Sequence, residues 1–178
     1  MEQAVELFEK ASSKGHEWAK NNCEIAKHCI NRNKKHSKSP KLFGLSIVGA
    51  TRDAMRHAIK KDGATPMREE YNYFADQYDP SPVLTGTDEL YVFYSHDYGD
   101  NDYGHGTDLL AKVQYRFPAH MDSGKITEVK EMVASKYGKP SSSSGRVNLG
   151  EVSYVWKEDG AEVKVWRGWP YTTVYLVY

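Results

Sequence analysis

The chain has 178 residues, of which 39% are apolar and 27% charged, and its 24 acidic residues balance its 24 basic ones. This length and composition predict one globular core with room for a small appendage, and they exclude a chain that is disordered throughout. A formal charge of zero means that no overall field draws the protein toward nucleic acid or an anionic membrane. No apolar run approaches the ~20 residues that a membrane-spanning helix needs. We therefore expect neither a membrane span nor a nucleic-acid partner.

The first 33 residues predict two helices joined by a turn. Apolar residues recur at helical spacing over residues 3–14, Gly15 and His16 interrupt the run, and a second helical run follows. Cys23 and Cys29 lie in the second run, rotated by about 240° from one another on a helix. We expect them to be buried as small apolar side chains, and neither to pair as a disulfide nor to bind zinc.

A repeat pattern runs through this hairpin, carried by Ala4, Phe8, Lys10, Ala11, Gly15, His16, Ala19 and Asn22. It resembles one repeat of the Sel-like family, which is related to the tetratricopeptide repeats. The resemblance implies that Gly15 makes the turn, that the alanines let the helices approach closely, and that the hairpin is a scaffold for protein partners. A single repeat cannot bury its own apolar faces. The hairpin therefore either packs on the rest of the chain or is the last member of an array that begins before Met1.

A basic stretch over residues 31–41 predicts a linker at residues 34–41. We expect a solvated helix end and connection there, with contact to a phosphate backbone as the alternative. The acidic N-terminus has no signal-peptide pattern. The expected compartment is the cytoplasm if Met1 is native, and the periplasm or envelope if a leader has been removed.

From residue 42 onward, strand-like runs alternate with two helical ones. Each predicted helix ends on a glycine with a proline two or three residues later, at Gly63 and Gly138. Thr51 is the expected N-cap of the first helix, and residues 141–145 are expected to form a flexible loop. The predicted helices cover residues 51–63 and 125–138, and the predicted strands cover residues 42–48, 70–76, 89–95, 108–117, 152–157, 161–167 and 171–178.

This order is strand, helix and three strands, written twice, with halves at about residues 42–117 and 118–178. Strands joined by short hairpin turns favour an α+β fold, in which one antiparallel sheet of residues 42–178 carries both helices on one face. The pattern resembles that of the beta-lactamase inhibitor proteins and of small bacterial envelope lipoproteins. No motif of either family is matched, so no functional residue is carried over.

An aromatic stripe crosses the predicted strands of the second half. If its members point away from the helices, they form an exposed ladder with a tryptophan at its rim, and such rings commonly anchor protein partners. The alternative is that these rings stabilise the sheet through cross-strand contacts or lie in the core, because a shift of one residue reverses the faces. The predicted binding residues are Tyr154, Trp156, Trp166, Trp169 and Tyr175.

The segment over residues 95–108 is the second candidate site. It holds His96, His105 and four aspartates, residue types that bind divalent cations, but the spacing does not match a calcium loop, and a long hairpin connection needs the same residues. Nucleophile, phosphate-binding, zinc-protease and dinucleotide motifs are absent from the sequence. Catalytic residues, a metal site and a cofactor are therefore not expected.

The sequence predicts a non-catalytic module that binds a protein or peptide through an exposed aromatic sheet face. The alternatives are a glycan or small-molecule binder that uses the same rings, and a metal-dependent hydrolase that uses residues 96–108.

Overall fold

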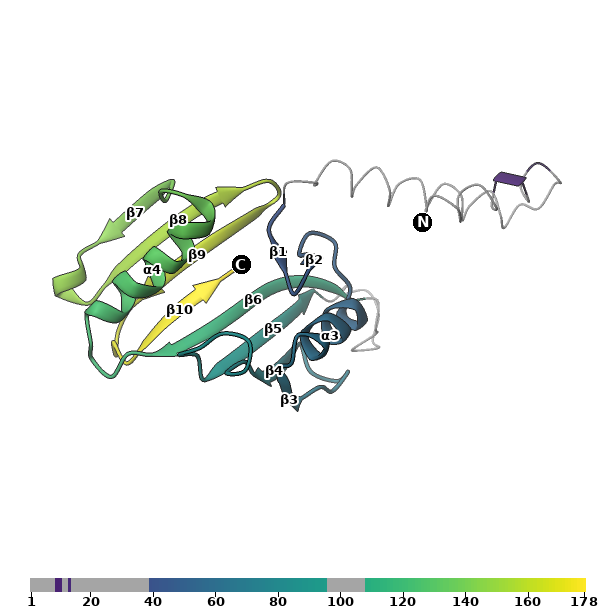
Figure 1. Cartoon of the computed structure of the whole chain (residues 1–178), viewed down its shortest axis with the longest axis horizontal. Helices are drawn as coiled ribbons and strands as arrows, with labels where there is room; N and C mark the ends of the chain where they lie inside the picture. The colour runs from purple at the N-terminus through teal and green to yellow at the C-terminus, as the bar shows by residue number, and fades with distance from the viewer. Residues whose placement is uncertain (1–8, 11–12, 14–38, 96–107) are drawn as a thin grey trace. The chain divides into compact units, whose positions relative to one another are not determined.

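The computed structural model describes residues 9–10, 13, 39–95 and 108–178, and the chain divides into two units between Lys38 and Ser39 (Figure 1). In the first unit Glu9 and Lys10 are helical, and the amide of Ser13 donates to the carbonyl of Glu9 at 2.9 Å. The rest of the predicted hairpin at residues 1–33, both cysteines and most of the predicted linker at 34–41 lie outside the described residues.

The second unit is α+β, as predicted, and its main element is a large antiparallel sheet (Figure 1). A small hairpin comes first, formed by β1 (Lys41–Leu42) and β2 (Leu45–Ser46). The described helices are α3 (Arg52–Lys61), α4 (Gly124–Tyr137) and the short 3-10 helix η1 (Val147–Leu149). The eight strands of the sheet are β3 (Thr65–Arg68), β4 (Ala75–Asp79), β5 (Glu89–Ser95), β6 (Leu109–Pro118), β7 (Ser142–Gly145), β8 (Val152–Glu158), β9 (Ala161–Arg167) and β10 (Thr173–Val177).

The order of elements repeats along the second unit. Helix α3 is followed by strands β3 to β6, and α4 is followed by β7 to β10. Across the sheet the order is β3-β4-β5-β6-β10-β9-β8-β7, so the last strand of each half lies at the centre. Strands β6 and β10 pair antiparallel there, with Tyr175 opposite Arg116. The two halves therefore meet edge to edge and form one continuous sheet.

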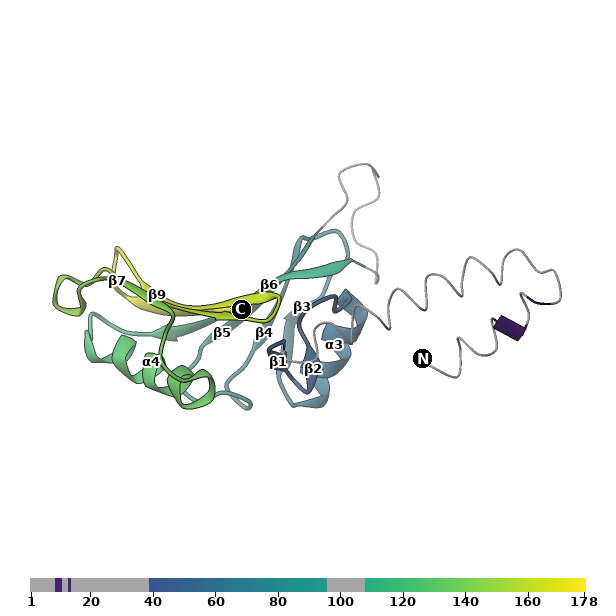
Figure 2. The same ribbon diagram turned by 90° about the horizontal axis from the view of Figure 1, so that it is seen from above.

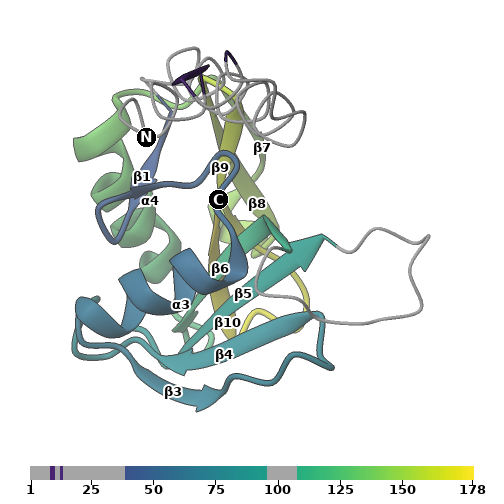
Figure 3. The same ribbon diagram turned by 90° about the vertical axis from the view of Figure 1, so that its right-hand side faces the viewer.

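Three predictions about the strands are wrong. Each helix is followed by four strands and not by three. The additional strands are β3 and β7, which lie at the two edges of the sheet; Figure 3 shows β3 as the outermost strand of the first half. The predicted strand at residues 42–48 is the β1–β2 hairpin, whose turn holds Phe43 and Gly44 at positive φ. The strand predicted at residues 70–76 begins only at Ala75.

The two long helices begin and end close to their predicted limits. The hydroxyl of Thr51 accepts a hydrogen bond from the amide of Ala54 at 3.4 Å, which confirms Thr51 as the N-cap of α3. Helix α4 ends at Gly138, whose φ of 77° suits glycine. Within the described residues, no helix has the length and apolar character to cross a membrane.

One hydrophobic core runs through both halves of the second unit, which we call the sheet domain. Met55 and Ile59 of α3 and Ile126, Val129 and Val133 of α4 are buried in it, as their helical spacing predicts. Helix α3 packs on β6, while α4 packs on β9 and β10 (Figure 2). Alternate residues of the strands complete the core: Tyr78, Leu90, Val92, Tyr94, Val113, Tyr115, Phe117, Val152, Trp156, Val163, Val165, Val174 and Leu176.

Candidate functional site

The strand residues that alternate with the core residues form a second surface, which we call the outer face. Because directly paired residues of neighbouring strands lie on the same side of a sheet, the register fixes its members. The outer face includes Ala75 and Gln77 of β4, Glu89, Tyr91 and Phe93 of β5, Lys112, Gln114 and Arg116 of β6, Tyr175 and Val177 of β10, Glu162, Lys164 and Trp166 of β9, Ser153, Val155 and Lys157 of β8, and Ser142 and Ser144 of β7.

One row of the outer face crosses six strands without a break. Its members are paired in register in the order Glu89, Arg116, Tyr175, Trp166, Ser153 and Ser144. The guanidinium of Arg116 donates to the Glu89 carboxylate. The rings of Trp166 and Tyr175 stack with centroids 4.5 Å apart and an angle of 17° between their planes. Both rings are half-buried, so each keeps an exposed surface.

A second aromatic group lies in the other half of the outer face, and the predicted site did not include it. Phe74, just before β4, stacks on Phe93 with centroids 6.0 Å apart, and Phe93 stacks on Tyr91 at 6.1 Å. Phe74 is 68% exposed. The ammonium of Lys112 lies 3.9 Å from the centroid of Phe93, close enough for a cation–π contact. The alternation of Tyr91 and Phe93 with Leu90 and Val92 in the correctly predicted strand could have revealed this group.

The structure brings only some of the predicted binding residues together. Trp166 and Tyr175 lie on the outer face, and Trp169 is 80% exposed in the turn between β9 and β10. Trp156 and Tyr154 do not belong to this surface, because they pair with the core residues Val163 and Val165 and so face the opposite way.

The expectation that Trp156 belongs to an exposed aromatic ladder is wrong. Its side chain is only 1% exposed, and its indole N–H donates to the carbonyl of Gly138 at 2.8 Å, at the end of α4. Tyr154 is half-buried against the core, with the ammonium of Lys130 5.6 Å from its ring centroid. The prediction for β8 was shifted by one residue, so it assigned Tyr154 and Trp156 to the wrong face of the sheet. The faces predicted for the residues of β9 and β10 agree with the structure.

The outer face carries charge on β6, between its two aromatic groups, and on β9, beside Trp166. Lys112 and Lys164 make no salt bridge to a described residue, whereas Arg116 is paired with Glu89. The amide of Gln77 donates to both Glu89 and Tyr91 at 3.3 Å. Burial, and then the nearby charge of Glu89, raises the pKa of Tyr91, so this phenol stays a neutral donor. The middle of the outer face, on β6, is therefore polar, with one paired arginine and one lysine that contacts Phe93.

A shallow hollow of about 370 Å³ adjoins the ring of Trp166. Ser144, Ser153, Lys164 and Gly168 contribute to its lining, so hydroxyl groups and an ammonium surround one aromatic wall. This arrangement offers a flat ring for stacking together with several hydrogen-bonding groups.

The segment at residues 95–108, which was the alternative candidate for a metal site, lies almost entirely outside the described residues. Its last residue, Asp108, forms an ion pair with the buried guanidinium of Arg52 at 3.1 Å. Within the described ranges, no three His, Cys, Asp or Glu side chains gather in a way that could hold a metal ion.

Comparisons with known proteins add one structural similarity. No protein-family model matches the chain, and no curated protein matches it. Among solved structures it is similar to the crystal structure of a DUF4309 family protein, YjgB, from Bacillus subtilis subsp. subtilis str. 168, with 16% sequence identity and a TM-score of 0.42. The similarity covers 82% of this chain and 90% of that chain.

Proposed function

We propose that the sheet domain is a non-catalytic interaction module whose outer face binds a protein or peptide partner. The observation that carries the proposal is the pair of stacked aromatic groups, Phe74–Phe93–Tyr91 and Trp166–Tyr175, on either side of the polar outer residues of β6. The partner that fits is a protein surface with apolar side chains flanked by carboxylates, because Lys112 and Lys164 make no salt bridge to a described residue.

The proposal takes α3 and α4 to cover the same side of the sheet, which leaves the outer face open. Two observations support this. Side chains of both helices enter one core cluster with the same alternate residues of the strands. In the view of Figure 2, both helices are drawn on the same side of the strands.

Sheet stabilisation alone accounts less well for these rings. Cross-strand aromatic pairs do stabilise sheets, by about 0.2–1 kcal/mol each. However, Phe74 and Trp169 lie outside the strands and are mostly exposed, so they add little to such pairing. Exposed rings gathered on one surface are typical of binding sites, where buried aromatic anchors contribute ~2 kcal/mol or more each.

Affinity capture from the source cell with matched baits tests the proposal. The baits are the wild type, Phe93→Ala, Trp166→Ala and the control Leu149→Ala, which removes an exposed apolar side chain from η1. We expect one captured protein to be retained by the control and lost from both face variants. With that protein purified, each face variant should raise Kd by about tenfold or more, and added salt should weaken binding. If the face variants capture the same proteins as Leu149→Ala at the same affinity, the outer face is not the interaction site.

Glycan binding is the second candidate, favoured by the hydroxyl-lined hollow beside Trp166. A sugar ring stacked on this indole would change its fluorescence. Titration with a panel of oligosaccharides should then give saturable quenching in the wild type and none in Trp166→Phe. Quenching that persists in Trp166→Phe would assign the binding to another site.

The metal-dependent hydrolase remains a prediction for residues 96–108. A bound divalent cation stabilises only the folded state, so it would raise the melting temperature of the chain. Measurement of Tm with and without added calcium, magnesium or zinc tests that alternative.

A further inference from the structure

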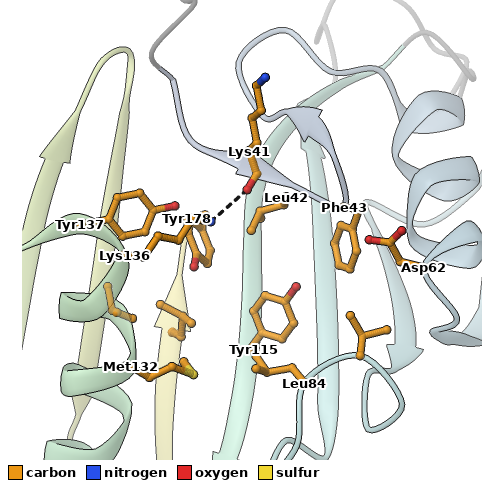
Figure 4. Close-up of a pocket in the computed structure, with 13 residues that line it drawn as sticks. Lys41, Leu42, Phe43, Asp62, Leu84, Tyr115, Met132, Lys136, Tyr137 and Tyr178 are labelled. Carbon is orange, nitrogen blue, oxygen red and sulfur yellow. Dashed lines mark hydrogen bonds between the residues drawn. The ribbon is translucent and has the colours of Figure 1, made fainter.

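An apolar cavity of about 260 Å³ lies on the core side of the sheet, where the two halves meet (Figure 4). Tyr115 of β6 and Leu176 of β10, which are paired in register, both line it. Met132 comes from α4 in the second half, while Phe43 and Leu84 come from segments of the first half. No part of the proposed outer face lines this cavity.

The position of the cavity follows from the duplication. Helix α3 contacts β6 from one side of the seam between the two halves and α4 contacts β10 from the other, and the cavity lies between the two helices (Figure 4). The β1–β2 turn and the segment around Val83 and Leu84 close the seam in part, but they leave space over the central pair of strands. The cavity is partly open at the surface, so a small molecule can enter it. An apolar space that is retained at a junction is a typical ligand site.

Three tyrosines line the cavity, and Tyr137 and Tyr178 lie together at one end of it (Figure 4). The ring centroids of Tyr137 and Tyr115 each lie 6.4 Å from that of Tyr178. The Tyr137 hydroxyl oxygen is buried and has no hydrogen-bond partner among the described residues. Burial, and then the nearby phenols Tyr137 and Tyr115, raises the pKa of Tyr178, so its hydroxyl keeps its proton at neutral pH. A buried hydroxyl without a partner is costly unless a ligand or water supplies one.

The same end of the cavity carries a positive charge. The ammonium of Lys136 donates to the carbonyl of Lys41 at 3.2 Å and keeps two further N–H groups (Figure 4). Asp62 also lines the cavity, and Figure 4 shows it apart from Lys136 and Tyr137, beside Phe43. Hydrogen-bond donors therefore dominate the end formed by Tyr137, Tyr178 and Lys136, and they need an acceptor.

We propose that this cavity binds a small acyl compound, with its apolar chain against Met132, Leu84 and Phe43 and its acyl oxygen on Tyr137 and Lys136. Dry cavities of about 150 Å³ accept benzene, so a cavity of this size suits a molecule of about ten non-hydrogen atoms. An eight-carbon carboxylate has that size and ends in two acceptor oxygens. The proposal does not rest on the interaction assigned to the outer face.

Calorimetric titration of the full chain with octanoate, octanamide and octylamine tests the proposal. We expect octanoate to bind with one molecule per chain and to raise Tm, since a ligand of the folded state stabilises it. Octylamine, which offers only donors when protonated, should bind at least tenfold more weakly. Equal binding of octanamide would identify the acyl oxygen as the recognised group, and its loss would identify the free carboxylate. Octylamine binding as tight as that of octanoate, or no binding of either acyl probe, would overturn the proposal.

Matched variants locate the site. Tyr137→Phe removes the unpartnered hydroxyl and keeps the ring, and its control Tyr154→Phe changes a tyrosine that does not line the cavity. Lys136→Met is paired with Lys139→Met, which lies just beyond α4. We expect Tyr137→Phe and Lys136→Met each to weaken octanoate about tenfold, with both controls unchanged. If either control weakens binding as much as its partner, the acyl group is not held at this end of the cavity.

A filling variant tests the cavity itself. Leu84→Trp adds ring volume to the apolar end, so it should abolish octanoate binding, and an unchanged far-ultraviolet circular dichroism spectrum would show that the chain is folded. Retained binding in folded Leu84→Trp would place the ligand elsewhere. Trp166→Ala, on the outer face, should leave octanoate binding unchanged, which separates this proposal from the interaction proposed above.

Discussion

At the scale of single residues, Trp156 and Trp166 show how strongly the direction of one side chain decides its role. Both lie in strands of the same half, but the indole of Trp156 is enclosed by the core and bonded to Gly138, whereas Trp166 stacks on Tyr175 at the surface. Loss of a core aromatic costs about 3–5 kcal/mol of stability, because the transfer free energy and the packing contacts are lost together. Loss of a surface stack costs about 1 kcal/mol.

This difference gives a direct prediction for two variants. Trp156→Ala should lower the free energy of unfolding by about 3–5 kcal/mol, while Trp166→Ala should lower it by about 1 kcal/mol. Urea denaturation followed by circular dichroism measures both values. Trp156→Phe, which keeps an aromatic ring but removes the N–H donor to Gly138, should fall between them. Equal losses for the two alanine variants would contradict the opposite facing of these side chains.

Some residue-scale features could not be predicted from the sequence. Met55 and Ile59, on the apolar stripe of α3, are fully buried. Arg56 is buried beside them, where it donates two hydrogen bonds of 2.7 Å to Asp76 of β4. From the sequence, an arginine next to an apolar stripe is expected to lie in solvent. The burial of Arg56 could not be predicted, because its partner lies in a distant strand that sequence spacing does not reveal.

At the scale of elements, the limits of a strand could be predicted where apolar and polar residues alternate along it. Strands β5 and β9 have the predicted limits, because one phase of each is apolar and turn residues bound them. Strand β7 was expected to be a loop, because its serines and glycine carry no apolar pattern and its residues are all exposed. It is a strand because its residues pair with Val152–Val155 of β8.

The phase of β8 could not be decided from its sequence. Val152, Tyr154 and Trp156 form one phase, and Ser153, Val155 and Lys157 form the other, so apolar residues occur on both sides. The structure selects the first phase because Trp156 fits between β9 and the end of α4. Tertiary packing therefore determines what the strand pattern left open, and the outward placement expected for Tyr154 and Trp156 was wrong for that reason.

Glycine at the end of β7 gives a prediction at this scale. Gly145 has a φ of 80°, and a Cβ added there would collide with the carbonyl of Glu151 and lie 2.9 Å from the Cα of Val152. Gly86 has a similar φ of 86°, but a Cβ there would meet nothing within 4 Å. Gly86→Ala should cost about 1–2 kcal/mol for the left-handed backbone alone. Gly145→Ala should cost more and should release β7 from β8.

Denaturation of the two alanine variants measures this difference, and hydrogen exchange of the β8 amides reports on the pairing with β7. Faster exchange confined to residues that face β7 would locate the damage at this edge. Similar costs for both variants, with unchanged exchange, would show that the close approach at Gly145 relaxes without loss of pairing.

At the scale of the whole molecule, buried phenols tie stability to pH. Burial is the largest cause of the raised pKa values of Tyr78, Tyr94, Tyr115 and Tyr178. Tyr78 also donates a hydrogen bond to Glu69 at 2.7 Å, which adds to the shift. A raised pKa in the folded state means that the neutral phenol is favoured there, so its contribution is complete below the unfolded pKa of about 10.

Above about pH 10 the unfolded chain loses phenolic protons that the folded chain retains, so the free energy of unfolding should fall as pH rises. The slope should approach about 1.4 kcal/mol per pH unit for each buried tyrosine. Urea denaturation across this range measures the slope, and phenolate absorbance reports ionisation. Tyr115→Phe should make the slope shallower by about one proton. Complete ionisation near pH 10 without unfolding would contradict the burial of these phenols.

The pairing of β6 with β10 bears on how this chain arose in evolution and on where it can be cut. An antiparallel junction between two like halves has the geometry of a contact between two identical subunits related by a two-fold axis. Either half alone would present an edge strand with unpaired backbone groups, β6 in the first half or β10 in the second, and such an edge is a template for self-association. The structure is therefore consistent with descent from a smaller dimeric ancestor by fusion. It also marks the connection at residues 119–123 as the place where the chain could be cut into two pieces that reassemble into one sheet.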